Sequence, residues 1–324
     1  MTSYVLRVRR GAAAVAGVLA LTALPACAQG EQRQQGEQRG QGTGVAGAAS
    51  AGQEVGKQPD AKSVKRDFQA LEKEFDARIG VYALDTGSGR TVGHRPDERF
   101  AYASTFKALA AGAVLRKYGV DGMDKVIHYS KEDIVANSPI SEDFVESGMS
   151  LRELCAATVW YSDNTAVNLL LEDLGGPDAL EAVLAELGDD VIRMDRYEPD
   201  MSEGRPGDPR DTSTPRAMTG SLRAMLLGDA LKREERELLA TWMRTNTTGE
   251  TLVAAGVPDG WTVGDKSGTA GYGGRNDIAV LWPENGGNPI VLSVLTSRDE
   301  ENAERRDEVV ARAAEVALKG LGRS

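Results

Sequence analysis

The sequence contains very little cysteine or histidine. Among its 324 residues there are 2 cysteines, Cys27 and Cys155, and 2 histidines, His94 and His128. Two cysteines cannot build a disulfide framework or a thiolate zinc site, and the histidines are too far apart in the chain to form an H-x-x-x-H pair. We therefore expect no metal and no other cofactor.

Positive charge is also scarce. Lys and Arg number 38 against 49 Asp and Glu, which gives a formal net charge of −11. An acidic protein lacks the positive field that sequence-independent nucleic-acid binding needs, so no nucleic-acid partner is expected. The hydrophobic content of 41% and charged content of 27% are typical of a packed soluble protein and exclude a disordered chain or a multi-span membrane protein.

The first 27 residues resemble an export signal. Arg7, Arg9 and Arg10 precede a run of almost purely apolar residues over 11–24, and there is no acid before that run. The run is well short of the ~20 residues that a membrane-spanning helix needs. Residues 1–27 are therefore predicted to direct export.

Two processing routes fit the end of this segment. The small residues of Ala26-Cys27-Ala28 permit cleavage after Ala28, whereas Leu24-Pro25-Ala26-Cys27 resembles a lipobox in which Cys27 becomes lipidated. Arg9-Arg10 also permits a twin-arginine route beside the general secretory one. Residues 28–60 are rich in Gln and Gly and have no apolar periodicity, as in a flexible tether, which favours an anchor at Cys27. We expect an exported protein, either extracellular or anchored to the outer face of the cell membrane.

The rest of the chain, residues 61–324, has strand patterns at both ends and helical patterns between them. Apolar residues at helical spacing predict a helix over 61–77, and alternating or continuous apolar runs predict strands early and late in the chain. Expected strands are 78–85, 91–94, 261–267, 276–282 and 289–297; expected helices are 150–161, 164–174, 177–187, 215–228, 233–245 and 300–320.

This order of elements predicts an α+β fold. An antiparallel five-stranded sheet built from both chain ends and flanked by helices would account for the strands, and the middle of the chain would form an all-helical lobe. Binding sites favour the cleft between two such lobes, so we expect the active site there.

Three short motifs could carry chemistry. In Ser104-Thr-Phe-Lys107 a hydroxyl and an amine lie three residues apart, on one face of a helix and at its N-terminal end. A lysine can serve as the base for a serine nucleophile, although an N-cap serine followed by a surface lysine reads the same way. Ser162-Asp163-Asn164 lies between two predicted helices, and Asp265-Lys266-Ser267-Gly268-Thr269 ends a predicted strand. Alone, each is compatible with ordinary caps and turns.

Together, the three motifs occur in the order known for class A β-lactamases and penicillin-binding proteins. A fourth match, Arg196-Tyr197-Glu198-Pro199, lies in an irregular stretch and resembles the omega loop of the class A enzymes. The chain thus resembles a class A serine β-lactamase of actinobacterial type over most of residues 61–324. The resemblance implies hydrolysis of the β-lactam amide of penicillins and cephalosporins, and hence antibiotic resistance, by a chain that acts as a monomer.

The resemblance also implies a role for each residue. Ser104 would be the nucleophile, Lys107 or Glu198 its base, Ser162 the proton relay to the leaving nitrogen and Glu198 the base of deacylation. The backbone N–H groups of Ser104 and Thr269 would form the oxyanion hole. The remaining implied residues hold the substrate: Lys266, Ser267, Gly268, Thr269 and Arg275 around its carboxylate, and Asn137, Asn164 and Ser202 around its side chain or the hydrolytic water.

Three positions depart from the family pattern, one of them being Ala270, where close relatives often have glycine. Ser202 stands where many members have an asparagine that helps to hold the hydrolytic water, and Cys155 lacks the cysteine partner that some members have, because Ala111 occupies that position. Cys155 is therefore expected to be a buried free thiol. Arg196 is expected to pair with Asp211, and Asp163 to be structural.

Two other functions use the same motifs. A D-alanyl-D-alanine carboxypeptidase shares the first three of them but lacks the loop glutamate, and a penicillin-binding sensor domain would be acylated and stop there. Glu198 is the residue that distinguishes a β-lactam hydrolase from these two alternatives.

Overall fold

The computed structural model describes residues 60–284 and 286–323. The predicted export segment and all but the last residue of the predicted tether lie outside these residues. In the part of the chain that is described, no helix combines the length and the apolar character needed to cross a membrane.

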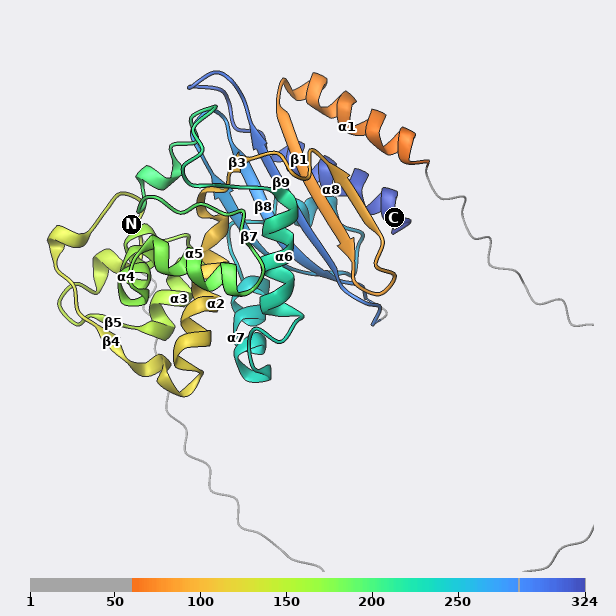
Figure 1. The fold of residues 1–324 in the computed structure, drawn as a ribbon. Coiled ribbons are helices and arrows are strands. Elements are labelled where there is room, and N and C mark those ends of the chain that lie inside the picture. The colour runs from red at the N-terminus through yellow and green to blue at the C-terminus, as the bar shows by residue number, and fades with distance from the viewer. Residues whose placement is uncertain (1–59, 285, 324) are drawn as a thin grey trace, which may run out of the picture. The chain divides into compact units, whose positions relative to one another are not determined.

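A five-stranded antiparallel sheet forms the centre of the fold, in the order β2-β1-β9-β8-β7 (Figure 1). The strands are β1 (Arg78–Asp85), β2 (Thr91–His94), β7 (Thr262–Thr269), β8 (Arg275–Trp282) and β9 (Ile290–Ser297). Strand β1 pairs along its whole length with β9, so an early and a late segment of the described residues meet in the middle of the sheet.

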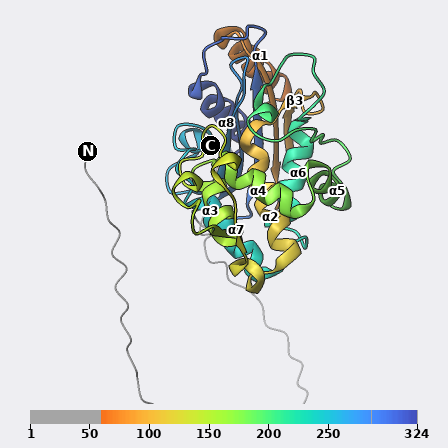
Figure 2. The same cartoon turned by 90° about the vertical axis from the view of Figure 1, so that its left-hand side faces the viewer.

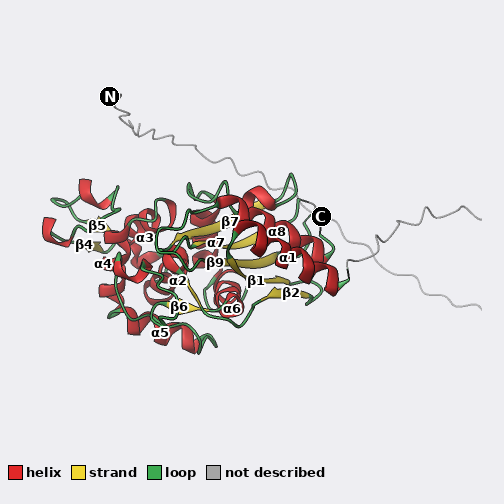
Figure 3. Cartoon of the chain, turned by 90° about the horizontal axis from the view of Figure 1, so that it is seen from above, coloured by secondary structure: helices red, strands yellow, loops and turns green. Residues whose placement is uncertain are grey.

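Helices cover both faces of this sheet. Helices α1 (Ala61–Phe75) and α8 (Asp307–Leu321) lie side by side on one face, and α6 (Pro215–Leu226) lies against the other (Figure 3). In α1 the side chains of Val64, Phe68 and Leu71 are spaced along one face, and all of them are buried. The apolar periodicity of the sequence thus predicts which face of α1 packs against the rest of the protein.

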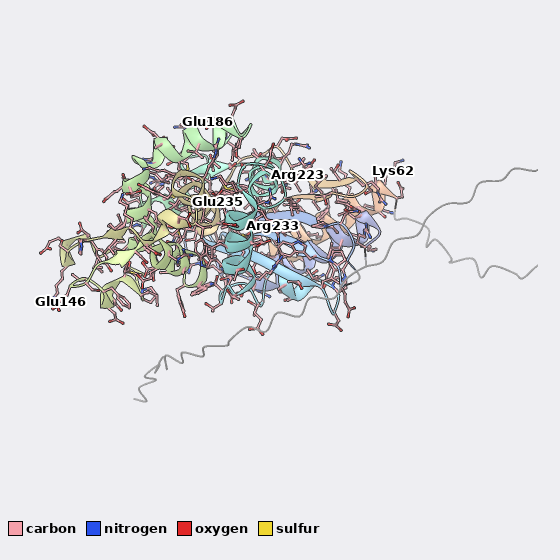
Figure 4. All side chains as sticks on the ribbon, turned by 90° about the horizontal axis from the view of Figure 1, so that it is seen from below. Lys62, Glu146, Glu186, Arg223, Arg233 and Glu235 are labelled. Carbon is pink, nitrogen blue, oxygen red and sulfur yellow. The ribbon has the colours of Figure 1, made fainter. Side chains whose placement is uncertain are left out.

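The remaining α-helices form a second, helical lobe next to the β7 edge of the sheet (Figures 1 and 2). They are α2 (Phe106–Tyr118), α3 (Leu151–Trp160), α4 (Asn164–Leu174), α5 (Pro177–Glu186) and α7 (Arg233–Arg244). Glu146, in this lobe, and Lys62, in α1, lie at opposite ends of the described unit (Figure 4). The predicted fold class, an antiparallel sheet with flanking helices and an all-helical lobe, is confirmed.

Two short antiparallel strand pairs were not predicted from the sequence. Strand β3 (Phe100–Ala101) pairs with β6 (Thr212–Ser213), and β4 (Val126–Ile127) pairs with β5 (Met149–Ser150). Two residues give too short a run for an alternating pattern to be visible in the sequence.

Among the helix ends that differ from prediction, those of α1 and α8 have a clear physical cause. Helix α1 ends at Phe75 rather than at residue 77, because Asp76 adopts a left-handed conformation that caps the helix. Helix α8 begins at Asp307 rather than at residue 300. The carboxylate of Asp307 accepts hydrogen bonds from Arg275 and Thr251, so a tertiary contact fixes the first turn of the helix at this point.

Candidate active site

Ser104 lies at the start of the helical lobe, in a one-turn 3-10 helix (Ala103–Thr105) that runs directly into α2. Ala103, just before it, has a φ of 47°, a left-handed conformation that is rare for a residue with a side chain and that commonly occurs at functional turns. Lys107 is in the first turn of α2, and its side chain is fully buried. The alternative of a surface lysine is therefore wrong.

Glu198 brings these two side chains together. The Ser104 hydroxyl donates a hydrogen bond to Glu198 Oε1 at 3.1 Å, and Lys107 Nζ lies 3.3 Å from the same oxygen. Glu198 is only 3% exposed, so the carboxylate faces the serine and not bulk solvent. An alcohol, an ammonium and an acid from distant parts of the chain thus share one hydrogen-bonded cluster.

Asn168 fixes the backbone of Glu198. Its side-chain amide donates to the carbonyl of Glu198 at 2.8 Å, and its carbonyl oxygen accepts from the Glu198 N–H at 3.0 Å. Asn168 is not among the predicted site residues, although it lies one helical turn after Asn164 on α4, where an inward-facing amide is expected. The peptide bond between Glu198 and Pro199 is cis.

The ends of this loop are joined by ion pairs. Arg196 Nε donates to Asp211 Oδ2 at 2.5 Å, as predicted, and Arg196 Nη1 donates to Glu203 Oε2 at 2.6 Å. The second carboxylate oxygen of Asp211 accepts from the backbone N–H groups of Asp195 and Arg196. These bonds close the loop that carries Glu198.

The Ser162-Asp163-Asn164 segment forms the opposite wall. Lys107 Nζ donates to the carbonyl of Ser162 at 2.7 Å and to Asn164 Oδ1 at 2.5 Å, and the Ser162 hydroxyl lies 3.4 Å from the same nitrogen. Asp163 is fully buried, caps α4 and accepts three hydrogen bonds from Ile140 and Ser141. Its structural role is therefore confirmed.

The end of strand β7 forms the third wall. Lys266 is fully buried, and its Nζ donates to the carbonyl of Ser267 at 2.8 Å. A Cβ atom on Gly268 would lie 2.9 Å from the carbonyl oxygen of Tyr102, so only glycine allows β7 to pack this closely against the turn that carries Ser104. The hydroxyls of Ser267 and Thr248 are hydrogen-bonded at 2.7 Å.

Burial perturbs the titration of both lysines. It lowers the pKa of Lys107, an effect that the Glu198 carboxylate opposes. Burial, together with the positive charge of Lys107, lowers the pKa of Lys266 to about 7. Burial raises the pKa of the neighbouring carboxyls of Asp265, to about 6, and of Asp277, and the charges of these two carboxyls oppose the lowering of the Lys266 pKa.

The guanidinium of Arg275 makes two contacts. Its Nη1 donates to the hydroxyl of Thr269 at 3.0 Å, and its Nε donates to Asp307 Oδ1 at 2.6 Å. The same guanidinium thus forms an ion pair with Asp307 and reaches the end of β7.

These walls enclose a cavity of about 490 Å³. All but two of the predicted site residues line it, and Lys107 and Lys266 lie beneath its surface. The sequence analysis assigned no site role to Tyr161, Thr248 or Arg305, which also line the cavity. The lining includes Ser104, Asn137, Ser162, Asn164, Glu198, Ser202, Ser267, Gly268, Thr269 and Arg275.

Comparison with known proteins supplies the family. The family model described as "Beta-lactamase enzyme family" matches residues 63–321. The chain belongs to this β-lactamase family. A β-lactamase from Amycolatopsis lactamdurans is 55% identical over 264 residues, which cover 82% of this chain and 87% of the relative. A "Beta-lactamase 1" from Streptomyces cacaoi is 49% identical and covers 94% of this chain and 95% of its own length.

A solved structure supports the same assignment. The crystal structure of a class A β-lactamase from Clostridium kluyveri superposes with a TM-score of 0.79 at 43% identity, and covers 80% of this chain and 99% of that one. The resemblance to class A β-lactamases is therefore confirmed. Within this family the expected departure at Cys155 is also seen, since Cys155 is a buried free thiol whose pKa is raised by burial.

Proposed function

We propose that this β-lactamase hydrolyses the amide of β-lactam antibiotics by forming and then hydrolysing an ester at Ser104. The observation that supports this most directly is the hydrogen bond from the Ser104 hydroxyl to buried Glu198, with Lys107 against the same carboxylate. A serine with a base in contact, on the wall of a cavity, is the arrangement that nucleophilic catalysis requires.

In acylation, the Ser104 oxygen attacks the lactam carbonyl carbon and its proton passes to Glu198. We assign the base role to Glu198 because the hydroxyl donates to it directly, whereas Lys107 donates to Glu198, Asn164 and the carbonyl of Ser162. The C–N bond then breaks, and Lys107 gives a proton through the Ser162 hydroxyl to the lactam nitrogen. Lys107 takes a proton from Glu198 in return, which leaves Glu198 ionised again. The N–H groups of Ser104 and Thr269 hold the oxyanion, each contributing ~3 kcal/mol of barrier lowering.

The other predicted residues position the substrate. Lys266, Ser267, Thr269 and Arg275 would bind its carboxylate at the end of β7, where cationic and hydroxyl groups gather. Asn164 and Asn137 would contact its side chain across the cavity, and Gly268 would leave the backbone accessible.

In deacylation, the ionised Glu198 takes a proton from water, the water oxygen attacks the ester carbon, and the bond from that carbon to the Ser104 oxygen breaks. The Ser104 oxygen then takes the proton from Glu198, which restores both groups. The two alternative functions lack this glutamate-assisted step: the peptidase hydrolyses its ester without a loop glutamate, and the sensor remains acylated. A buried carboxylate in contact with the nucleophile favours the hydrolase over both.

The direct test is turnover of a chromogenic cephalosporin by the full chain. We expect many turnovers per enzyme molecule, measured by absorbance. A burst of one equivalent followed by a stop would instead favour the sensor, and hydrolysis of D-alanyl-D-alanine peptides without cephalosporin turnover would favour the peptidase.

Ser202 provides a milder prediction. Its hydroxyl donates to Glu198 Oε2 at 2.9 Å from the position where the family often has asparagine. Ser202→Ala removes one hydrogen bond to a charged group, worth about 1.5–3 kcal/mol, so the deacylation rate should fall roughly tenfold or more. Pre-steady-state kinetics would measure this rate, and Ser202→Asn should restore it. An unchanged rate in the alanine variant would show that the hydroxyl has no part in deacylation.

The lowered pKa of Lys266 predicts that substrate binding depends on pH. Because its pKa is about 7, the ammonium is present below that pH and is lost as the pH rises through it. The KM for a carboxylate-bearing β-lactam should therefore increase severalfold between pH of about 6 and about 9, while kcat changes less. Lys266→Arg keeps the positive charge over this range and should give a flat KM. A flat profile in the wild type would contradict the prediction.

For the N-terminal segment we propose export, with residues 1–27 as the signal and 28–60 as a tether to a monomeric catalytic unit. The basic and apolar segments of the sequence support this, and Cys27 offers a lipid anchor. Mass spectrometry of the protein from its native cells tests the anchor: a diacylglyceryl group on Cys27 supports it, and an unmodified N-terminus at Gln29 excludes it.

A further inference from the structure

A second cavity, the rear hollow, lies between the strand ends of the sheet and the segment that follows Glu198. It has a volume of about 170 Å³. On one side it is bounded by Arg78 at the start of β1 and by Arg99, next to β3. On the other side it is bounded by the end of the catalytic loop. The loop residues that line it include Arg196, Gly204, Arg205, Asp208 and Arg210.

Arginines outnumber acids around the rear hollow. Five arginines line it, and Asp208, which pairs with Arg210, is the single acidic residue of the lining. Outside the lining, Asp211 pairs with Arg196, and Glu203 contacts Arg196, Arg205 and Arg210. Glu98 serves both Arg78 and Arg95. Four carboxylates thus contact four of the five lining arginines, which leaves a small excess of positive charge at the hollow.

Arg99 adds a charge with no acid beside it. Its guanidinium donates to the carbonyls of Val191 and Thr212 and to the Thr212 hydroxyl, and it makes no ion pair with any described residue. Each guanidinium has five N–H donors. The described residues leave donors over at Nε of Arg99 and at Nη1 of Arg205 and of Arg210. The hollow therefore has both the charge and the donors for an anion.

We propose that the rear hollow binds a small tetrahedral oxyanion with the size and charge of inorganic phosphate. A water molecule occupies about 30 Å³ of liquid volume, so the hollow has room for an anion of five heavy atoms and accompanying water. Guanidinium groups form paired, charge-assisted hydrogen bonds with such oxygens. This site is separate from the active-site cavity, with which it shares no lining residue.

The bound anion would join two parts of the fold. Arg78 and Arg99 belong to the sheet side, whereas Arg196, Arg205 and Arg210 belong to the loop that holds Glu198. One anion between them adds a link between loop and sheet, so its binding stabilises the folded state over any state in which the loop has opened.

The test measures the melting temperature of the full chain in inorganic phosphate, with sodium chloride at equal ionic strength as reference. We expect the melting temperature to rise by about 3 °C for each tenfold increase in phosphate above its dissociation constant. In the double variant Arg205→Gln, Arg210→Gln the rise should fall by at least half. These two side chains are 62% and 46% exposed, so their replacement leaves the core intact.

Arg216→Gln is the matched control. Arg216 is 47% exposed and pairs with Asp97 away from the hollow, so this variant should keep the full rise. Competitive inhibition of cephalosporin hydrolysis by phosphate separately reports binding in the active-site cavity, and it should be equal in all variants. Absence of a phosphate-specific rise in the wild type, or a full rise in the double variant, would overturn the proposal. Because the melting measurement needs no turnover, it stands or fails independently of the proposed function.

Discussion

Glu198→Gln should convert the enzyme into a stable acyl-enzyme. The glutamine amide is nearly isosteric and can still accept a hydrogen bond from Ser202, but it cannot take a proton from water. The rate of deacylation should therefore fall by about 10²–10⁴-fold, the usual contribution of a positioned base. With benzylpenicillin, intact-protein mass spectrometry should show the mass of the enzyme plus one whole antibiotic.

Two control variants make this result specific. Ser104→Ala should show no adduct, because the nucleophile is absent. Glu237→Gln removes a 62% exposed carboxylate of α7 that does not line the active-site cavity, and this variant should still turn over and show no lasting adduct. An acyl-enzyme that is cleared as fast in Glu198→Gln as in the wild type would exclude Glu198 as the deacylating base. Since Glu198 is also assigned the proton in acylation, the adduct should form more slowly than in the wild type.

Lys107→Met should reduce both acylation and stability. The ammonium is fully buried, and its loss leaves the carboxylate of Glu198 without its ion-pair partner and Asn164 without its donor. Removing one partner of a buried pair commonly costs about 3–5 kcal/mol of folding free energy. The rate constant for acylation should fall by about 10²–10⁴-fold, because the charge that holds the serine and its base in place is gone.

Stopped-flow acylation and urea unfolding measure these two effects. Lys117→Met is the matched control: it lies on the same helix, is 41% exposed and pairs with Asp173. A surface pair of this kind contributes little, so activity and stability should change only slightly. Acylation at the wild-type rate in a folded Lys107→Met variant would show that the lysine is not part of the machinery.

The sheet and most helices were predictable because their burial leaves a periodic trace in the sequence. The run from Arg78 to Asp85 gave the bounds of β1, and Ser, Thr and Asp caps marked several helix starts. The start of α8 was not predictable in this way. It depends on the ion pair between Asp307 and Arg275, which lie far apart in the chain and meet only after folding. Local pattern carries no information about such a contact.

The residues of the active site also fall into a group that the sequence identifies and a group that only the structure reveals. Ser104, Lys107 and Glu198 were identified because they belong to known motifs, and the structure brings them into one cluster. Asn168 and Thr248 belong to no motif, so their contacts with Glu198 and Ser267 emerged only from the geometry. The lowered pKa of Lys266 likewise depends on burial and on the charge of Lys107, neither of which a linear sequence displays.

The pairing of β1 with β9 has a consequence for biogenesis. Residues 78–85 leave a ribosome or a translocation pore long before their partner, residues 290–297, so the middle of the sheet stays open until nearly the whole polypeptide has emerged. A protein with this topology cannot complete its fold part-way through synthesis. This topology is therefore compatible with threading through a narrow channel as an extended chain, because β1 has no partner strand until residues 290–297 arrive.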